Sequence, residues 1–495
     1  MLGDIKNIKD KTLAKLMLVF VAIYALRFII SLSMGLMPQD AYYYYYSEHL
    51  DWCYYDHPPM VAYMLKVFSL ILGKSAMAVK LADFTISLLT FLTFHQLAKV
   101  FLSRTRALFA AVLFGSTLLL SVVSVNTTPD VPLLFFWTLS LLFAAKAIRS
   151  GHWLHWLLMG LCMGLSFTSK YTALFLPAGF VLFLLLSGPH RKQIFSWKAL
   201  LAILFFGIGI FPVVYWNYSN DWASFAFQSS GRAGEIMEFK LQPLLFLGNL
   251  GTQLMLLIPI LFVAMFIVLF KSTRRYIKAG FRTDPDFLFL MCFSLPILLF
   301  FFGVSTVYWV KLNWMMPGYL SAIILVAIYC RKKTLSYQLW TSLGLHLLFA
   351  VQILFYPVNV KSDDTWVGWA EFSEQADQRM QAHPDKFLFA DDDYKTTAML
   401  TFYTDRTVYA GNVIGRDGKQ FEVIHKDLSG LLGKDAIFID SDKKLKNAEM
   451  SGVLPEKARA YFEEITELEP ISVFRGERLV RKFYVYQCKN YKGQP

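Results

Sequence analysis

Residues 199–216 have the sequence ALLAILFFGIGIFPVVYW, which contains no charged side chain. A helix of that length rises about 27 Å, at about 1.5 Å per residue, and the hydrocarbon core of a bilayer is about 30 Å thick. A helix that is apolar on every face is either buried in a large core or surrounded by lipid. This stretch therefore predicts a membrane-spanning helix.

Runs of the same kind recur through the first 356 residues. Each is close to the roughly 17–25 residues that a spanning helix needs. We predict eleven spans, near residues 13–35, 77–99, 107–125, 131–148, 153–169, 172–188, 198–216, 244–270, 287–304, 314–330 and 336–356.

The composition also indicates that lipid surrounds most of the chain. Hydrophobic residues make up 56% and charged residues 17%, whereas a soluble domain has about a quarter charged residues. The five cysteines show no Cys-X-X-Cys spacing, which disfavours a metal or redox motif. A disulfide between Cys53 and Cys488, both predicted outside, is a less favoured alternative.

The net charge of +12 belongs to the hydrophobic part. Residues 1–356 contain 28 Lys and Arg against 13 Asp and Glu, and residues 357–495 contain 20 against 23. With the N-terminus inside, 20 of the 28 basic residues fall in inner connections, as the positive-inside bias requires. The charge therefore implies no nucleic acid, and we expect a bacterial inner-membrane protein with a periplasmic C-terminal domain. A cleaved signal peptide at the first span is less favoured.

Two long outer loops are expected, at residues 36–76 and 217–243. The first contains Met60–Leu72, which is too short to span and suits a helix in the interface. Residues 357–495 have the composition of a soluble α/β domain. Its predicted strands are Lys386–Ala390, Ala436–Asp440 and Lys482–Gln487, and its predicted helices are Thr396–Tyr403 and Glu456–Leu468. Asp391–Asp393 could suggest a metal site there, but a solvated turn is favoured.

The segment PQDAYYYYY, residues 38–46, opens the first outer loop. Asp40 precedes a run that can form a helix, so its carboxylate can act as an N-cap. The alternative is a carboxylate base at the mouth of a membrane cavity, because acidic residues near lipid usually have a function. The tyrosines are typical of the membrane–water interface, with stacking against a sugar as a second possibility.

Two more acidic motifs lie on the same predicted face. In YYDHPPM, residues 54–60, the prolines hold the chain extended and fix an Asp56–His57 pair. A rigid turn without function is the alternative. Asp130 ends the short turn NTTPD, residues 126–130, and either caps the following span or presents its carboxylate to a ligand.

Two basic motifs lie on this face as well. Lys170 and Tyr171 end the fifth predicted span, and Lys311 lies in YWVKLNWMMP, residues 308–317. Each lysine either extends to the interface without a partner or binds substrate.

Together these motifs resemble those of the bacterial dolichyl-phosphate-mannose protein mannosyltransferase superfamily, the GT-C glycosyltransferases. The chain is similar to the lipid A aminoarabinose transferases and related lipopolysaccharide sugar transferases. The resemblance covers roughly residues 13–320 and is weaker around Asp393–Tyr403. It implies a polytopic α-helical membrane protein of the GT-C type, with about eleven transmembrane helices and an outer α/β domain.

The resemblance also implies roles for single residues. Asp40 stands where the family has the acid that is central to catalysis, although Ala41 replaces its usual second acid, and Asp130 matches the other important acid. His57 replaces a family lysine, so its binding of phosphate would depend on pH. A divalent metal at Asp56 and His57 stays open, and no cofactor is certain. The implied substrate- or phosphate-binding residues are Asp56, His57, Lys80, Lys170, Tyr171, Arg232, Lys240, Lys311 and Asn313.

The expected reaction is inverting transfer of a sugar from a polyprenyl-phosphate donor to an outer-face glycolipid, lipid A or lipopolysaccharide core. Asp40 would act as general base on the acceptor hydroxyl, and cations would stabilise the leaving phosphate. A protein O-mannosyltransferase is an alternative within the same fold. A transporter or lipid flippase is another, but it would need more polar groups at mid-membrane than Arg27 provides. A non-catalytic scaffold is the last alternative.

Overall fold

The structure is a computed structural model that describes residues 11–231, 240–279, 284–441 and 458–493. The chain forms two compact units. The N-terminal unit contains Met1–Ser33, His57–Met64 and Lys80–Leu354. The C-terminal unit contains Met34–Asp56, Leu65–Val79 and Phe355–Pro495, so it takes up two segments of the first predicted outer loop.

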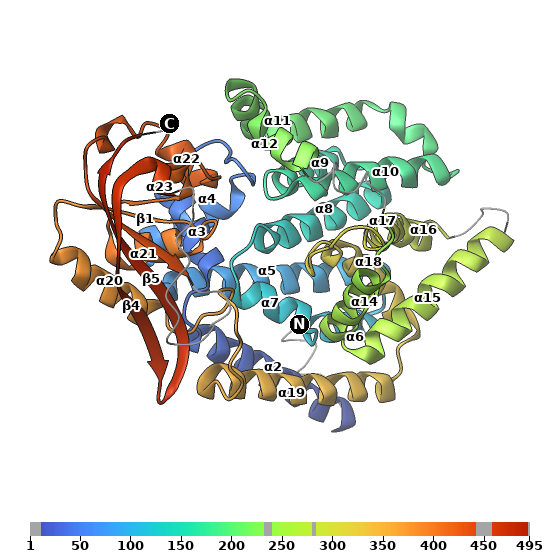
Figure 1. Ribbon diagram of the computed structural model, residues 1–495. Coiled ribbons are helices and arrows are strands. Elements are labelled where there is room, and N and C mark those ends of the chain that lie inside the picture. The colour runs from blue at the N-terminus through green and yellow to red at the C-terminus, as the bar shows by residue number, and fades with distance from the viewer. Residues whose placement is uncertain (1–10, 232–239, 280–283, 442–457, 494–495) are drawn as a thin grey trace. The chain divides into compact units, whose positions relative to one another are not determined.

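The N-terminal unit is built of helices (Figure 1). Among the described residues, six are long and apolar enough to cross a membrane, and the chain is a multi-pass membrane protein. These are α2 (Lys11–Ser33), α5 (Ala76–Phe101), α8 (Asp130–Ser150), α11 (Trp197–Ser219), the pair α16 (Pro285–Cys292) and α17 (Leu295–Val304), and α19 (Lys332–Phe355).

The other predicted spans are also helical but are shorter or bent. α9 (Trp153–Phe167), Tyr171–Leu186 with α10 (Phe175–Leu186), and α18 (Met316–Tyr329) have between 10 and 17 residues. The number of crossings therefore stays a prediction. α4 (Met60–Leu72) is a short helix, as its length predicts.

Two predicted spans are broken. Residues 107–125 form α6 (Arg104–Gly115) and α7 (Leu118–Val125), bent by 58°. Residues 244–270 form α14 (Pro243–Leu257) and α15 (Pro259–Lys278), bent by 108°, so the segment predicted as a span there consists of two helices. Pro259 has no N–H to continue the first helix, and Ile258 adopts a positive φ of 70°.

Helices α9 and α11 pack with their backbones in contact. A Cβ on Gly160 would lie 2.1 Å from the carbonyl oxygen of Ala202, and one on Gly164 would lie 2.8 Å from the Cα of Gly209. The Thr168 hydroxyl donates to the Gly209 carbonyl at 2.6 Å. Small residues four apart are the usual way to let membrane helices approach closely.

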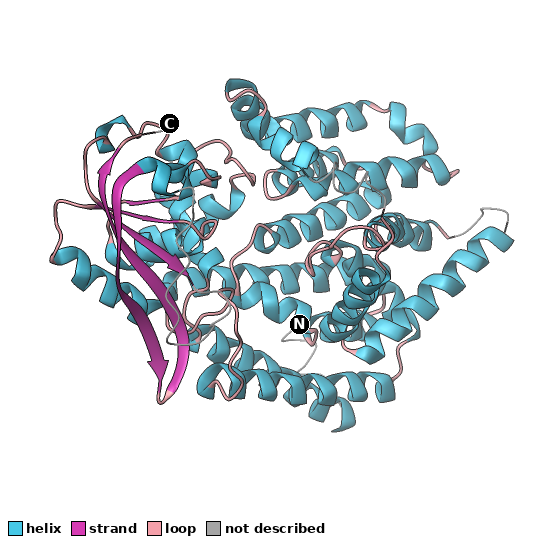
Figure 2. Cartoon of the chain, viewed as in Figure 1, coloured by secondary structure: helices cyan, strands magenta, loops and turns pink. Residues whose placement is uncertain are grey.

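The C-terminal unit contains a five-stranded sheet in the order β2-β1-β3-β5-β4 (Figure 2). β1 pairs in parallel with β2 and β3, while β5 runs antiparallel to β3 and β4. The strands are β1 (Phe387–Ala390), β2 (Val408–Tyr409), β3 (Ala436–Ser441), β4 (Phe462–Arg475) and β5 (Arg478–Tyr491), and the helices are α3 (Pro38–Glu48), α20 (Trp369–Gln381), α21 (Lys395–Thr404), α22 (Lys419–Ile424) and α23 (Ala458–Tyr461).

The predicted helix at Glu456–Leu468 was wrong. Its first two residues lie outside the described chain, only Ala458–Tyr461 is helical, and the rest belongs to β4. Glutamates favour a helix locally, but this segment pairs along its length with β5 through a tight turn at Gly476, whose φ is 62°. Pro470 falls at a register shift between Leu468 and Ile471, where a strand tolerates proline.

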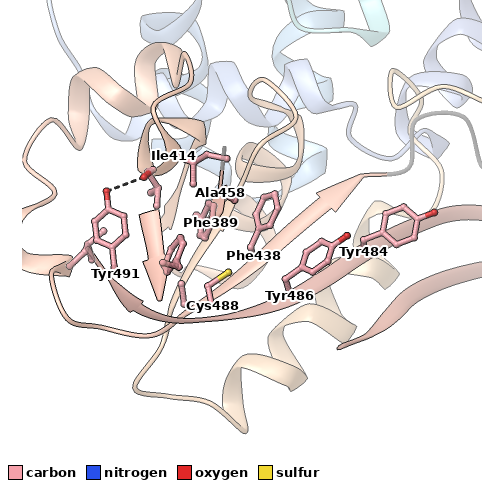
Figure 3. Packing of buried hydrophobic residues seen from close by; sticks show 12 residues of the cluster. Phe389, Ile414, Phe438, Ala458, Tyr484, Tyr486, Cys488 and Tyr491 are labelled. Atoms are coloured by element: carbon pink, nitrogen blue, oxygen red, sulfur yellow. Dashed lines mark hydrogen bonds between the residues drawn. The ribbon is translucent and has the colours of Figure 1, made fainter. Parts of the chain in front are cut away.

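Aromatic side chains form the core of this sheet (Figure 3). Phe389 stacks on Phe438 with ring centroids 4.7 Å apart, and the Tyr491 hydroxyl donates to the carbonyl of Val413 at 3.0 Å. Cys488 lies in the same core as a free thiol, and Cys53 is also free and buried, so the less favoured disulfide does not form.

The tyrosine run belongs to the protein interior. All five tyrosines of α3 are at most 5% exposed. Tyr42 stacks on Tyr394 at 4.4 Å and Tyr45 on Phe421 at 4.3 Å between centroids. The predicted interfacial position was therefore wrong, because aromatic rings of the C-terminal segment cover this helix.

The α9–α11 contact gives a test of the fold. Gly164→Leu should lower the free energy of unfolding by about 1–3 kcal/mol or more, because the new side chain has no room. Gly207→Leu on α11 is the matched control, since a Cβ there meets nothing within 4 Å. Thermal unfolding of the purified protein measures both. Equal midpoints for the two variants would contradict the close packing.

Candidate functional site

A buried ion pair lies at the first turn of α8. Asp130 is fully buried and Lys170 is 8% exposed. The Lys170 ammonium lies 2.8 Å from each carboxylate oxygen of Asp130, and the Asn313 amide donates to Oδ2 at 2.5 Å. Three motifs that are far apart in the sequence thus meet at one carboxylate.

Local structure places each member of this set. Asp130 follows the helix cap Pro129, and Lys170 follows the end of α9 in an extended conformation. The N–H of Met60 donates to the carbonyl of Thr168 at 3.1 Å. The residues after Pro58 and Pro59 are therefore fixed beside the loop that carries Lys170.

A second polar cluster contacts the turn that precedes Asp130. Lys80 is 1% exposed, and its ammonium donates to the carbonyl of Val125 at 2.5 Å. Asp83, also fully buried, accepts a hydrogen bond of 2.7 Å from Thr127. The turn from Val125 to Asp130 is thus held by two charged residues of α5. Asp83 is absent from our predicted site, although its spacing from Lys80 puts both on one helix face.

In the C-terminal unit, Asp40 is fully buried near the start of α3. The predicted N-cap position was wrong by three residues, because Met37 is the cap and Asp40 is the third helical residue. Its Oδ2 accepts the backbone N–H of Met37 at 2.7 Å. An acid at this position reaches back over the first turn, as in a capping box.

Asp56 is 7% exposed and accepts a hydrogen bond from the hydroxyl of Tyr46. Burial raises the pKa of the Asp56 carboxyl, while Tyr46 and the charge of Lys419 lower it. The Lys419 ammonium itself lies 3.0 Å from a carboxylate oxygen of Asp393. The N–H of Tyr55 donates to Gln420 at 2.8 Å.

Lys419 and Gln420 were missed by sequence reasoning. Both come from α22, about 365 residues after the acidic motif that they support. No local pattern in the sequence distinguishes them from other polar residues of a soluble domain.

For most of the other predicted site residues, the structure gives a single contact or a degree of exposure. The Tyr171 hydroxyl lies 2.6 Å from that of Ser224, His57 is partly exposed, and Lys240 and Lys311 are exposed. Arg232 lies outside the described residues.

Within the described chain, no three His, Cys, Asp or Glu side chains are grouped to hold a metal ion. The possible metal at Asp56 and His57 therefore stays a prediction. Asp392 accepts the N–H of Thr396, in the first turn of α21, at 3.0 Å, and Asp391 pairs with Arg416 at 2.5 Å. These two aspartates thus have structural partners in the protein.

Comparison with known proteins gives consistent matches. Residues 56–216 match the family model of dolichyl-phosphate-mannose-protein mannosyltransferase. The lipid A galacturonosyltransferase RgtD of Rhizobium johnstonii is 26% identical over 348 residues, which cover 68% of this chain and 71% of that protein.

Solved structures show the same fold. The crystal structure of ArnT from Cupriavidus metallidurans bound to undecaprenyl phosphate has a TM-score of 0.65 at 14% identity, over 95% of this chain and 97% of that chain. Its apo form has a TM-score of 0.62 at 14% identity, over 96% and 98%. The GT-C resemblance and the predicted fold class are confirmed.

The buried ion pair predicts a large cost for removing one partner. Lys170→Met should lower the free energy of unfolding by about 3–5 kcal/mol, because it leaves the Asp130 carboxylate buried and uncompensated. Adding Asp130→Asn should restore part of this loss. Lys489→Met, in an exposed pair with Glu464, is the control and should change thermal unfolding far less. A double variant less stable than Lys170→Met would contradict the account.

Asp56 predicts a pH dependence of stability. Because its folded-state pKa is raised, the folded state holds this proton more tightly than the unfolded state. The resulting stabilisation is complete below the unfolded-state pKa of about 3.9 and is lost as pH rises through the folded-state pKa. Asp56→Asn removes this loss and keeps an acceptor for Tyr46. Its thermal midpoint should therefore rise relative to wild type with pH, whereas exposed Asp385→Asn should show no such trend. A constant difference for Asp56→Asn would contradict the assignment.

Proposed function

We propose that this GT-C chain is an inverting glycosyltransferase that moves a sugar from a polyprenyl-phosphate donor to lipid A or lipopolysaccharide core. The observation that supports this proposal most directly is the buried set of Asp130, Lys170 and Asn313. Asp130 and Lys170 both lie in the region that matches the family model. The activity named for the galacturonosyltransferase relative and the lipid bound to the ArnT structure support the acceptor and the donor class.

In the proposed mechanism, a carboxylate acts as the base and lysine side chains bind the phosphate. Asp40 takes the proton of the acceptor hydroxyl as its oxygen attacks the anomeric carbon. The bond from that carbon to the phosphate oxygen breaks, and the phosphate leaves with the electron pair. A lysine ammonium has three N–H donors, so Lys170 can bind both carboxylate oxygens of Asp130 and one phosphate oxygen, with Lys80 as a second candidate cation. Asp130 and Asn313 position Lys170 for this task.

The basic inner connections support an orientation with the N-terminus in the cytoplasm. In that orientation the turns that carry Asp130 and Lys170, and the C-terminal unit, lie on the outer side of the inner membrane. A glycolipid of that leaflet could then reach the donor headgroup. Which sugar is transferred, a hexose or a pentose, depends on the side chains that contact it.

A second candidate is a protein O-mannosyltransferase. The observation that favours it is the family model itself, which describes dolichyl-phosphate-mannose-protein mannosyltransferases. The same carboxylate base and phosphate cations would serve a serine or threonine hydroxyl. The two functions differ in the acceptor alone.

Mass spectrometry of envelope glycolipids tests the proposal. Cells without the gene should lack one sugar on lipid A or core, and wild-type protein should restore it. Asp40→Asn should reduce transfer by about 10²–10⁴-fold, the usual contribution of a general base, while its amide oxygen still accepts the Met37 N–H. Asp51→Asn, in the same loop, should restore the sugar fully.

The acceptor is also tested by this experiment. Unchanged glycolipids together with a missing O-linked sugar on envelope proteins would favour the second candidate. Normal transfer by Asp40→Asn at wild-type protein levels would exclude Asp40 as the base.

A further inference from the structure

The strands β4 and β5 form a hairpin that extends beyond the other strands of the sheet (Figure 2). Its tip, residues 474–479, is held against the segment that follows α19. Nη1 of Arg478 donates to the carbonyl of Pro357 at 2.8 Å, and the Asn359 amide donates to the carbonyl of Leu479 at 3.1 Å. The tip and residues 355–360 therefore form one surface of the C-terminal unit, which we call the hairpin surface.

Large apolar side chains are exposed on the hairpin surface. Phe474 is 56% exposed, Val358 is 64% exposed and Val360 is 41% exposed. Phe355, the last residue of α19, is 71% exposed. A single exposed hydrophobic residue is ordinary, whereas apolar side chains grouped on one surface mark a contact with a membrane or another molecule.

The place of residues 355–360 in the chain puts the hairpin surface beside the bilayer. α19 is long and apolar enough to cross a membrane and ends at Phe355. Near this end it exposes Leu348, Val351 and Leu354, as expected for a helix that is in hydrocarbon up to its last turn. Three extended residues reach at most about 11 Å, and the headgroup layer on each side of the hydrocarbon is about 5–8 Å thick. Val358 therefore lies in or next to that layer.

Basic side chains flank the apolar ones. Arg475 and Arg478 are exposed on either side of a two-residue turn that contains Glu477. The two arginines and one glutamate give the tip a net charge of +1. A guanidinium group binds phosphate through charge-assisted hydrogen bonds, and its apolar stem can cover hydrocarbon. Apolar side chains next to exposed arginines suit the headgroup layer of a phospholipid bilayer.

We propose that the hairpin surface docks on the phospholipid bilayer, with Phe474 and Val358 at the boundary between headgroups and acyl chains. Arg475 and Arg478 bind lipid phosphates. The hairpin thereby attaches the C-terminal unit to the membrane about 120 residues along the chain from the end of α19. This role is separate from the proposed sugar transfer and does not rest on it.

The experiment measures contact between lipid and a fluorophore on the tip of the full-length protein. Phe474→Cys is labelled with bimane and placed in vesicles of phosphatidylcholine and phosphatidylglycerol that contain a phosphatidylcholine with a nitroxide headgroup. All five native cysteines are buried, so the exposed thiol reacts first. The nitroxide should remove about half or more of the fluorescence, because a side chain buried about 5–10 Å into the interface is next to the quencher.

Glu464→Cys is the matched control, since it is an exposed position of the same strand. It lies ten residues from Phe474, or about 33 Å at about 3.3 Å per residue, and its label should lose little fluorescence. Val358→Cys, on the other segment of the hairpin surface, should be quenched as Phe474→Cys is. This second labelled position keeps the test valid if Phe474→Cys does not fold.

The contribution of the arginines is tested in the same vesicles. Adding Arg475→Gln to Phe474→Cys should lower the ratio of docked to undocked tips about fivefold, the usual effect of one basic residue at an anionic surface. Lys489→Gln, at the far end of β5, should leave the ratio unchanged. Equal quenching at positions 474 and 464 would overturn the proposal. Energy transfer between differently labelled copies without quenching by lipid would also overturn it, because the surface would then bind a second copy of the chain.

Discussion

The ion pair between Asp130 and Lys170 organises the polar end of the N-terminal unit. A buried carboxylate or ammonium is tolerated only with a partner and further hydrogen bonds, and here each supplies the other, with Asn313 as a third group. The pair fixes the start of α8 against the end of α9. Through Thr168 and Met60, the same loop holds the chain after the two prolines. Lys80 and Asp83 of α5 hold the turn before Asp130 through separate hydrogen bonds.

Much of this architecture could be predicted from the sequence. Apolar runs of spanning length have few alternatives to helices, so each predicted span is helical. The bends were harder to predict from the sequence, because they depend on single residues such as Ile258 and Pro259. The helix predicted over β4 shows how pairing with a neighbouring strand overrides a local preference. The tyrosines of α3 suit a membrane interface and a protein core equally well, and rings some 350 residues away, such as Tyr394, decide between the two.

The candidate site was also only partly predictable from the sequence. Asp130, Lys170 and Asn313 were each proposed as site residues from a motif, but their contact could not be predicted, because 40 residues separate the first two and 183 separate Asp130 from Asn313. Asp40 was identified by its place in the first outer loop, while its actual hydrogen bond depends on where the helix begins. Lys419 carries no local signal at all. A sequence shows which residues have side chains that can act as bases or bind phosphate. Which other side chains orient them depends on the tertiary fold.

The central claim is that these residues transfer a sugar from a polyprenyl phosphate with inversion at the anomeric carbon. The most direct measurement is transfer by the purified protein in lipid vesicles, with a polyprenyl-phosphate-linked sugar as donor and lipid A as acceptor. The anomeric configuration of the product is then read by nuclear magnetic resonance. The account predicts glycosylated lipid A and polyprenyl phosphate in equal amounts, with the configuration opposite to that of the donor. Retention of the donor configuration would contradict it.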